Sequence, residues 1–222
     1  VRLEPDVLAA WAWAHGGEAG IVLISGTGSI CYGQGSSGQS ARAGGWGPLF
    51  GDEGSAYEVG VGALRLLAAR EDGMESPGGL EARVMARWPE LGVDLRSWLR
   101  GIYRCKWGRE QVAALAEEVA RAAAEGDAGC AGVLARAAEG LARQAAAVER
   151  KLGETGLPLA VQGGFGRSAA GLLSLLERRL ADWGSSLRLV ESRLSPLSGS
   201  VLLAATTLGG PELARSVREV LE

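Results

Sequence analysis

The sequence predicts an α/β fold in which a mixed β-sheet is flanked by helices and interrupted by a mostly helical insertion. Residues 21–24 form a continuous apolar run, typical of a strand buried on both faces, and a glycine turn and a second strand follow it. Residues 78–152 are predicted to be almost wholly helical, with a long alanine-rich stretch over residues 110–151. A strand, a glycine turn and a helix then follow again, so we expect both ends of the chain to share one sheet.

The first part of the chain is predicted to be a short helix followed by three strands. The helix covers residues 7–14 and ends where Gly16 and Gly17 can adopt a left-handed conformation, and we expect His15 beside them to be solvated. A glycine turn joins the first two strands and a polar Gly/Ser hairpin tip joins the next two, and the strands cover residues 21–24, 30–33 and 41–47.

The rest of the chain is predicted to be mainly helical. Apolar residues recur at helical spacing over residues 53–69, which indicates an amphipathic helix. The helical insertion, about 78–152, is expected to break near Pro89, near Gly101 and at Gly126. Strand and helix then alternate. We expect a strand over residues 157–162, a helix over 169–180, a strand over 187–190 and a last helix that runs through Thr207.

Composition narrows the class of protein. The chain has 222 residues, of which 47% are hydrophobic and 22% charged, a balance typical of a soluble globular protein. It has no apolar run of about 18 residues, and its start lacks the order of a secretory signal, so we expect a cytoplasmic protein without a membrane partner. With a net charge of −3 and arginines spread along helical segments, no nucleic-acid partner is expected.

Cysteine and histidine usage excludes a Cys/His zinc site. Cys31, Cys105 and Cys130 are far apart in the sequence, and His15 is the only histidine. We therefore expect each cysteine to be a small buried hydrophobic residue, and we assign no metal ligand.

A first glycine-rich turn could hold a phosphate. Gly26, Thr27, Gly28 and Ser29 lie between two predicted strands, so backbone N–H groups can point at one anion while two hydroxyls add donors. A tight hairpin turn without a ligand explains the same pattern equally well. The turn is neither a P-loop, since no Gly-Lys-Ser/Thr follows, nor a dinucleotide fingerprint, since it leads into a strand.

A second glycine cluster joins a strand to a helix. Gly163 and Gly164 would let a flat adenine or ribose lie against the backbone at the carboxyl edge of the sheet. An ordinary strand-to-helix turn is the alternative.

The third cluster, residues 44–55, combines bare backbone with one indole and two adjacent carboxylates. Trp46 offers a flat apolar face to a sugar ring, Gly45 allows close approach, and Asp52 can accept hydrogen bonds from hydroxyls. Alternatively, Asp52 caps the following helix and Trp46 fills the core.

Asp6 precedes an alanine-rich apolar helix. Phosphoryl transfer to an alcohol needs a carboxylate that orients the hydroxyl and takes its proton, so Asp6 is a candidate general base. Its alternative role is a helix N-cap.

In this order and spacing, these segments resemble the BadF/BadG/BcrA/BcrD ATPase family of the actin-like ATPase superfamily, and within it the N-acetylglucosamine kinases. The resemblance covers nearly the whole chain. Its most specific part is the Gly-Asp-Glu-Gly-Ser element at residues 51–55, and the glycine turns at 26–29 and at 163–164 match the family's phosphate and adenosine motifs.

The resemblance implies a ribonuclease H-like lobe and ATP-dependent phosphorylation of an amino sugar hydroxyl, with Mg²⁺. It further implies roles for the matching residues: Asp6 as catalytic base, Gly26, Thr27, Gly28 and Ser29 as phosphate contacts, Gly163 and Gly164 as adenosine contacts, and Gly45, Trp46 and Asp52 as sugar contacts. Whether the protein forms a homodimer is left open.

Two departures from the family pattern matter. Ile30 stands where some sugar-phosphorylating members carry asparagine, which leaves the identity of the sugar open. No Asp-Gly-Gly-Gly-Thr element precedes Asp6, so we expect residues 1–222 to be the C-terminal lobe, without the N-terminal lobe that carries that first phosphate motif.

Two other functions remain as alternatives. Reductase-activating ATPases of the same family need a cysteine pair at a dimer interface, which the scattered cysteines do not provide. A non-catalytic module that senses a nucleotide or a sugar would bind its ligands without turnover.

Overall fold

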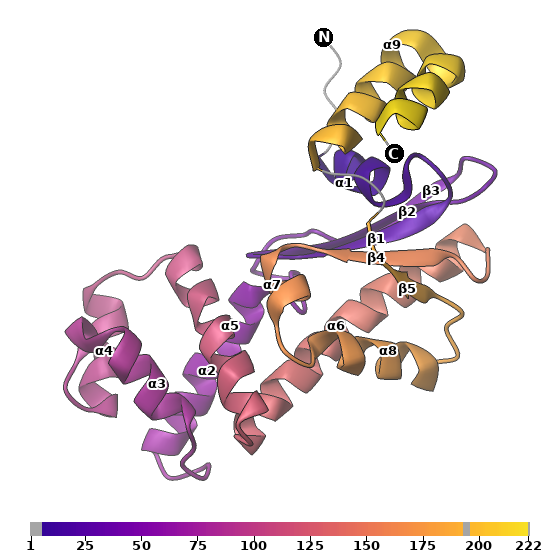
Figure 1. Ribbon diagram of the computed structural model, residues 1–222. Helices are drawn as coiled ribbons and strands as arrows, with labels where there is room; N and C mark the ends of the chain where they lie inside the picture. Colours follow the sequence, from indigo (N-terminus) through magenta and orange to yellow (C-terminus); the bar gives the residue numbers. More distant parts are fainter. Residues whose placement is uncertain (1–5, 193–195, 222) are drawn as a thin grey trace.

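The computed structural model describes residues 6–192 and 196–221 (Figure 1). The helices are α1 (Asp6–His15), α2 (Ala56–Glu71), α3 (Leu80–Arg87), the short 3₁₀ helix η1 (Pro89–Leu91), α4 (Leu95–Arg104), α5 (Arg109–Ala124), α6 (Ala128–Leu152), α7 (Gly164–Ser168), α8 (Leu172–Asp182) and α9 (Pro196–Leu221). The strands are β1 (Gly20–Ser25), β2 (Ser29–Gln34), β3 (Ser40–Gly44), β4 (Pro158–Gln162) and β5 (Arg188–Val190).

The five strands form one mixed sheet in the order β3-β2-β1-β4-β5. Strands β1, β2 and β3 are antiparallel neighbours, whereas β4 and β5 run parallel to β1. Strand β1 is therefore central, and the side chains of Ile21, Val22 and Leu23 are fully buried, which explains the unbroken apolar run. The predicted mixed sheet is confirmed, with both ends of the chain contributing to it.

Helices cover both faces of the sheet. Helix α1 packs on one face and α9 packs on α1, while α6 lies across the other face with α8 beside it (Figure 1). Helices α3, α4 and α5 and the distal part of α2 form an outlying helical group beyond one edge of the sheet. The predicted stretch of 78–152 thus comprises α3, η1, α4 and α5 of this group together with α6, which belongs to the layer beneath the strands.

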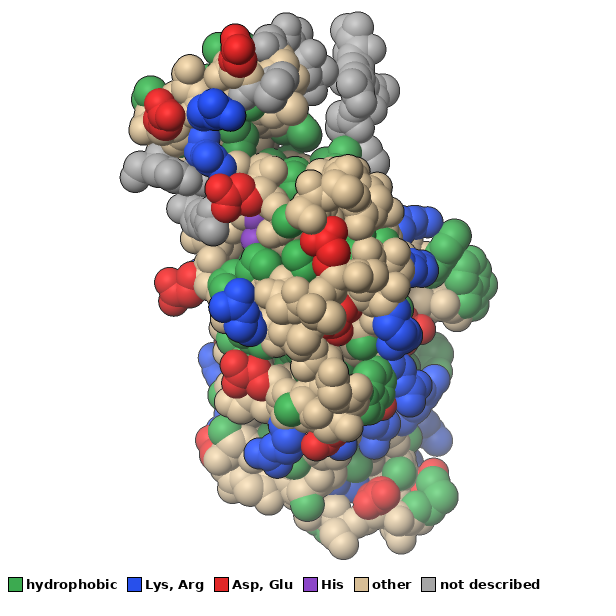
Figure 2. Space-filling view, turned by 90° about the vertical axis from the view of Figure 1, so that its right-hand side faces the viewer, with side chains coloured by type: hydrophobic (Ala, Val, Ile, Leu, Met, Phe, Trp, Pro, Cys, Tyr) green, Lys and Arg blue, Asp and Glu red, His purple; other side chains and the backbone are tan. Residues whose placement is uncertain are grey.

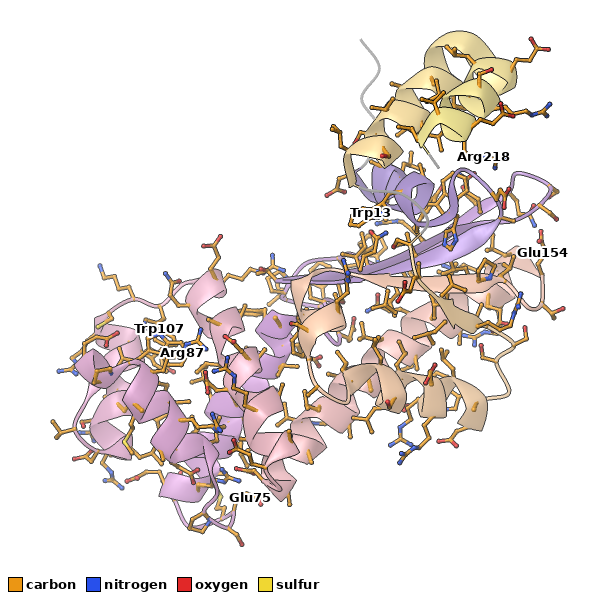
Figure 3. All side chains as sticks on the ribbon, in the orientation of Figure 1. Trp13, Glu75, Arg87, Trp107, Glu154 and Arg218 are labelled. Carbon is orange, nitrogen blue, oxygen red and sulfur yellow. The ribbon has the colours of Figure 1, made fainter. Side chains whose placement is uncertain are left out.

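Three tryptophans hold the outlying helical group together. Trp88, Trp98 and Trp107 have ring centroids 5.2 to 6.5 Å apart in tilted or edge-to-face arrangements, and Trp98 is fully buried. Figure 3 shows Trp107 in this group, at the opposite end of the molecule from Glu154. The group thus has an aromatic core of its own.

Three local expectations were wrong. His15 is buried, because its ring covers Gly20, which has no Cβ, and its Nε2 lies 2.9 Å from the carbonyl oxygen of Ile21. Cys105 is exposed at the end of α4, although Cys31 and Cys130 are buried as expected. Helix α4 continues through Gly101, where the missing side chain allows close packing against the carbonyl group of Leu91.

One face of the molecule and the described helices bear on the expectations for nucleic-acid and membrane partners. On the face shown in Figure 2, acidic and basic side chains intermingle. Among the helices in the described ranges, none is both long and apolar enough to cross a bilayer.

A buried ion pair joins the ends of three helices. Asp127 caps α6, its carboxylate accepts a hydrogen bond from the backbone N–H of Cys130 at 3.0 Å, and Nη2 of Arg70 at the end of α2 lies 2.6 Å away. The backbone N–H of Leu80, at the start of α3, also donates to it at 3.3 Å. Burial alone would raise the pKa of Asp127, but the hydrogen bonds from Arg70 and Cys130 lower this pKa to about 2.

We expect Asp127→Asn to lower the free energy of unfolding at pH 7 by about 2 kcal/mol, because Arg70 keeps its buried charge and loses its anion. A depressed pKa stabilises the folded state above the unfolded value of about 3.9, and this contribution disappears as the pH falls towards 2. Urea unfolding at several pH values measures the difference between wild type and variant.

The control is Asp182→Asn, which removes an exposed ion pair with Arg179 and should change the free energy of unfolding by less than about 0.5 kcal/mol. A difference between wild type and Asp127→Asn that stays constant from pH 7 to pH 2 would contradict the assignment.

Candidate functional site

The turn between β1 and β2 is tight and lies at the carboxyl end of the central strand. Ser25 and Ser29 pair across it, and the backbone N–H of Gly26 donates to the carbonyl of Gly28 at 2.9 Å. Thr27, at the tip, is exposed. This geometry also fits the alternative of a plain hairpin turn, so its function depends on what surrounds it.

The second glycine turn lies directly against the first. Because β4 runs parallel to β1, the turn that follows β4 emerges at the same edge of the sheet. Gly163 has a φ of 90°, and a Cβ at this position would lie 2.3 Å from the carbonyl oxygen of Ser25 and 2.9 Å from the backbone nitrogen of Gly26. Only a glycine permits this contact, so the structure brings these two predicted elements together.

The loop before α2 is tied beneath the first turn. Asp52 is 4% exposed, and its Oδ1 accepts a hydrogen bond from the backbone N–H of Ser29 at 3.1 Å. The hydroxyls of Ser25 and Ser29 donate to the carbonyls of Gly54 and Glu53, each at 2.8 Å. The third cluster therefore forms one hydrogen-bonded unit with the first.

Asp52 does not cap α2, so that alternative was wrong. Ser55 is the N-cap, and its hydroxyl accepts a hydrogen bond from the backbone N–H of Glu58 at 3.1 Å. The first residue of the helix, Ala56, donates its N–H to the carbonyl of Gly26 at 2.8 Å. Asp52 instead adopts a φ of 63°, unusual for a residue with a side chain.

Trp46 lies on the surface, so the alternative that it fills the core was also wrong. Its side chain is 60% exposed, and the guanidinium group of Arg42 lies 4.6 Å from the ring centroid. Gly45 beside it donates its N–H to the carbonyl of Ser29 at 3.0 Å. Trp46 also lines an open cavity of about 560 Å³ between this loop and α6.

Asp6 lies apart from these contacts. It is the first residue of α1, on the face of the sheet opposite α6, and its side chain is exposed. Within the described ranges, Asp6 makes no hydrogen bond to the turn between β1 and β2.

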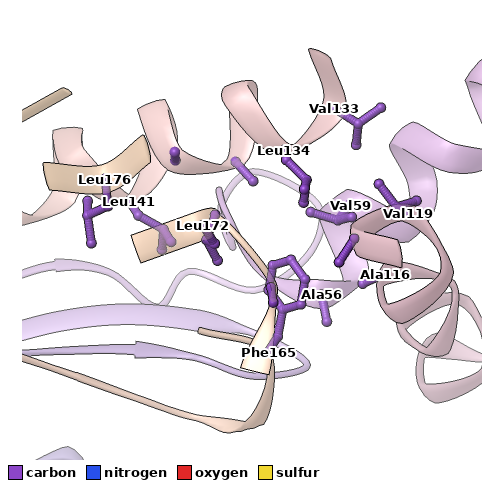
Figure 4. Packing of buried hydrophobic residues seen from close by; sticks show 14 of the residues in the cluster. Ala56, Val59, Ala116, Val119, Val133, Leu134, Leu141, Phe165, Leu172 and Leu176 are labelled. Atoms are coloured by element: carbon purple, nitrogen blue, oxygen red, sulfur yellow. The ribbon is translucent and has the colours of Figure 1, made fainter. Parts of the chain in front are cut away.

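A cavity of about 400 Å³ opens between α5 and α7, beside the second glycine turn. Its lining is dominated by small side chains, and Phe165 from α7 is directed towards Ala56 and Ala116 (Figure 4). The polar lining residues are Arg87, Glu117, Arg121 and Ser168. A slot of this kind can accept a flat ring, because alanine leaves space where larger residues would fill it.

The sequence profile of the BadF/BadG/BcrA/BcrD ATPase family matches residues 4–204. The chain belongs to this family. Among curated relatives, an N-acetyl-D-glucosamine kinase of Dictyostelium discoideum is 31% identical over 204 residues, covering 89% of this chain and 63% of the relative. An N-acetylmuramic acid/N-acetylglucosamine kinase of Clostridium acetobutylicum is 38% identical over 109 residues, or 49% of this chain and 35% of the relative.

Solved structures share the fold. A candidate N-acetylglucosamine kinase from Chromobacterium violaceum superimposes with a TM-score of 0.71 at 30% identity, covering 90% of this chain and 65% of that chain. A second such candidate, from Porphyromonas gingivalis, has a TM-score of 0.62 at 22% identity over 87% of this chain and 62% of that chain, and this likeness concerns the fold alone. The predicted α/β lobe of the actin-like ATPase type is confirmed. The chain spans less than two thirds of the length of each relative.

In this member of the BadF/BadG/BcrA/BcrD family, two residues whose side chains bind the loop and turn of the site were not predicted from the sequence. Gln144 from α6 is buried, and its Nε2 donates to the hydroxyl of Ser29 at 3.0 Å and to the carbonyl of Glu53 at 2.9 Å. Arg109, the first residue of α5, forms an ion pair with Asp52. A glutamine among the alanines of α6 is a weak sequence signal for this role. Arg109 gives no such signal, because it is 57 positions from Asp52 in the sequence.

In this family member, we expect Gly163→Ala to lower the free energy of unfolding by about 3 kcal/mol. The new methyl group would meet the carbonyl of Ser25 and would force a positive φ on alanine. The neighbouring Gly164→Ala is a matched control, because its Cβ would enter open space at the start of a helix, and it should change stability by less than about 1 kcal/mol. Equal melting temperatures for the two variants would show that the turns do not touch as described.

Proposed function

We propose that the protein acts as a sugar kinase that transfers the terminal phosphoryl group of ATP to a hydroxyl of an amino sugar such as N-acetylglucosamine. The observation that carries this proposal is the contact between Gly163 and the Ser25–Gly26 backbone, because it joins two glycine turns at one sheet edge. The relatives named as N-acetylglucosamine kinases support the same reaction class. Catalysis would consist of positioning and charge stabilisation.

The phosphates would lie at the turn between β1 and β2. Thr27 is exposed there and offers its hydroxyl, while Gly26 and Gly28 leave the backbone accessible. Ser29 is 3% exposed, and its hydroxyl already donates to Glu53. Its proposed contribution is therefore to hold the turn in shape.

The adenosine would lie in the alanine-lined cavity between α5 and α7. Gly163 and Gly164 directly precede Phe165, which lines this cavity and supplies an aromatic wall. Because Gly163 contacts the first turn and Phe165, two residues later, lines the cavity, we propose that one nucleotide spans both.

The sugar would contact the loop before α2. The exposed ring of Trp46 suits the apolar face of a sugar, and Gly45 keeps the neighbouring backbone open. Both carboxylate oxygens of Asp52 already accept one hydrogen bond each, and a carboxylate oxygen has two lone pairs. Asp52 can therefore accept a sugar hydroxyl while it keeps its place.

Magnesium would arrive with the nucleotide. The described residues contain no group of three acidic, cysteine or histidine side chains that could hold a metal ion by themselves. Mg²⁺ usually keeps several waters and binds one or two carboxylates together with substrate phosphates. Bound in this way, it would neutralise charge on the phosphates.

We expect Ala114→Leu to weaken ATP binding by about tenfold, because Ala114 lines the cavity and a larger side chain would occupy the space of the base. Ala131→Leu on the exposed side of α6 is the control and should leave binding unchanged. Calorimetric titration of the chain with Mg-ATP measures both. Equal affinities for wild type and Ala114→Leu would place the nucleotide elsewhere.

We expect Asp6→Asn in the full-length native polypeptide to reduce sugar-dependent ADP release by at least about a hundredfold, with sugar affinity unchanged, because the amide cannot take the hydroxyl proton. Asp72→Asn, an exposed carboxylate at the end of α2, is the control. Near-normal turnover of Asp6→Asn would remove Asp6 from this role. Wild-type protein that binds ATP and sugar without releasing ADP would instead indicate a sensing module.

A further inference from the structure

Arg109 connects the outlying helical group to the turn between β1 and β2. It begins α5, and its Nη2 forms the ion pair with Oδ2 of Asp52 and approaches the carbonyl oxygen of Thr27 at 3.4 Å. Arg109 is 57 positions from Asp52 and 82 positions from Thr27 in the sequence. One guanidinium group thus touches both the loop beneath the turn and the turn itself.

The ion pair is buried on one side only. The side chain of Asp52 is 5% exposed, whereas that of Arg109 is 40% exposed. Exposed ion pairs contribute little to the free energy of unfolding, but a buried carboxylate that loses its partner is left without compensation and destabilises the fold considerably more. Arg109 therefore stabilises the structure mainly by compensating the buried charge of Asp52.

Asp52 links the ion pair to the turn between β1 and β2. Its second oxygen, Oδ1, accepts the hydrogen bond from the backbone N–H of Ser29. Arg109 and Ser29 therefore donate hydrogen bonds to different oxygens of one carboxylate. The φ of 63° at Asp52 is strained for a residue with a side chain and persists only where contacts enforce it.

The pair also fills the space under the turn. A Cβ on Gly28 would lie 2.8 Å from Nη2 of Arg109 and 3.0 Å from Oδ1 of Asp52. The ring of Tyr57 lies on another side, with its centroid 5.7 Å from the guanidinium carbon. The turn therefore packs directly against the ion pair, and we expect its conformation to change if either charged side chain is removed.

We propose that Arg109 is a positioning residue, which fixes Asp52 and Thr27 so that the turn is preorganised for phosphate. Its planar guanidinium suits this task, because it holds a carboxylate and a carbonyl in fixed directions. The part of the proposal that concerns phosphate rests on the proposed function. The part that concerns the shape of the turn stands without it.

The first test needs no ligand. Arg109→Gln should speed amide hydrogen exchange at Ser29 by at least about tenfold, because the acceptor of that N–H loses its anchor. Arg109→Lys, which keeps the charge, should restore most of the protection. Arg96→Gln on α4, which removes an exposed ion pair with Glu71 at the end of α2, is the control and should leave exchange at Ser29 unchanged. Unchanged exchange at Ser29 in Arg109→Gln would overturn the proposal.

The second test separates phosphate from base. Arg109→Gln should weaken Mg-ATP binding by about tenfold and leave adenosine binding unchanged, because adenosine carries no phosphate. Equal losses for both ligands would indicate a general loss of structure and would overturn the proposed role. If wild-type protein binds neither ligand, the proposed function fails, and the exchange measurement still decides whether Arg109 positions the turn.

Discussion

The parallel pairing of β1 with β4 determines where the candidate site lies. It places the ends of two strands, separated by more than a hundred residues, at one edge of the sheet, and the turns that follow them touch through Gly163. Two further features of the site adjoin this contact. The loop before α2 fastens to the first turn, and the alanine-lined cavity opens beside the second.

Much of the fold could be predicted because it depends on local patterns. The apolar run in β1 requires burial on both faces, and the alanine-rich stretch favours helix whatever its partners are. Where the expectations for His15 and Gly101 failed, packing against another element decided the outcome. His15 is buried because Gly20 leaves space for its ring, and Gly101 stays within a helix because it packs against Leu91. Neither contact follows from the helical or strand periodicity of its segment.

The candidate site was also predictable only where local sequence patterns indicate it. Glycines and hydroxyls indicate an accessible backbone, so the three glycine-rich segments could be found from composition and order. The side chains that hold these segments could not. Arg109 and Gln144 lie on helices whose patterns explain them equally well as surface and core residues, and only the tertiary structure shows that they converge on Asp52 and Ser29.

The alanine-lined cavity has walls that belong to different parts of the molecule. One wall is α5, which is part of the outlying helical group, and the other is α7, which continues directly from the sheet. A molecule that fills the gap would act as a cross-link between two bodies that the chain joins elsewhere. Ligand binding would then reduce the relative motion of the two walls, because a ligand that contacts both stabilises the arrangement it binds by a free energy that rises with the logarithm of ligand concentration over Kd.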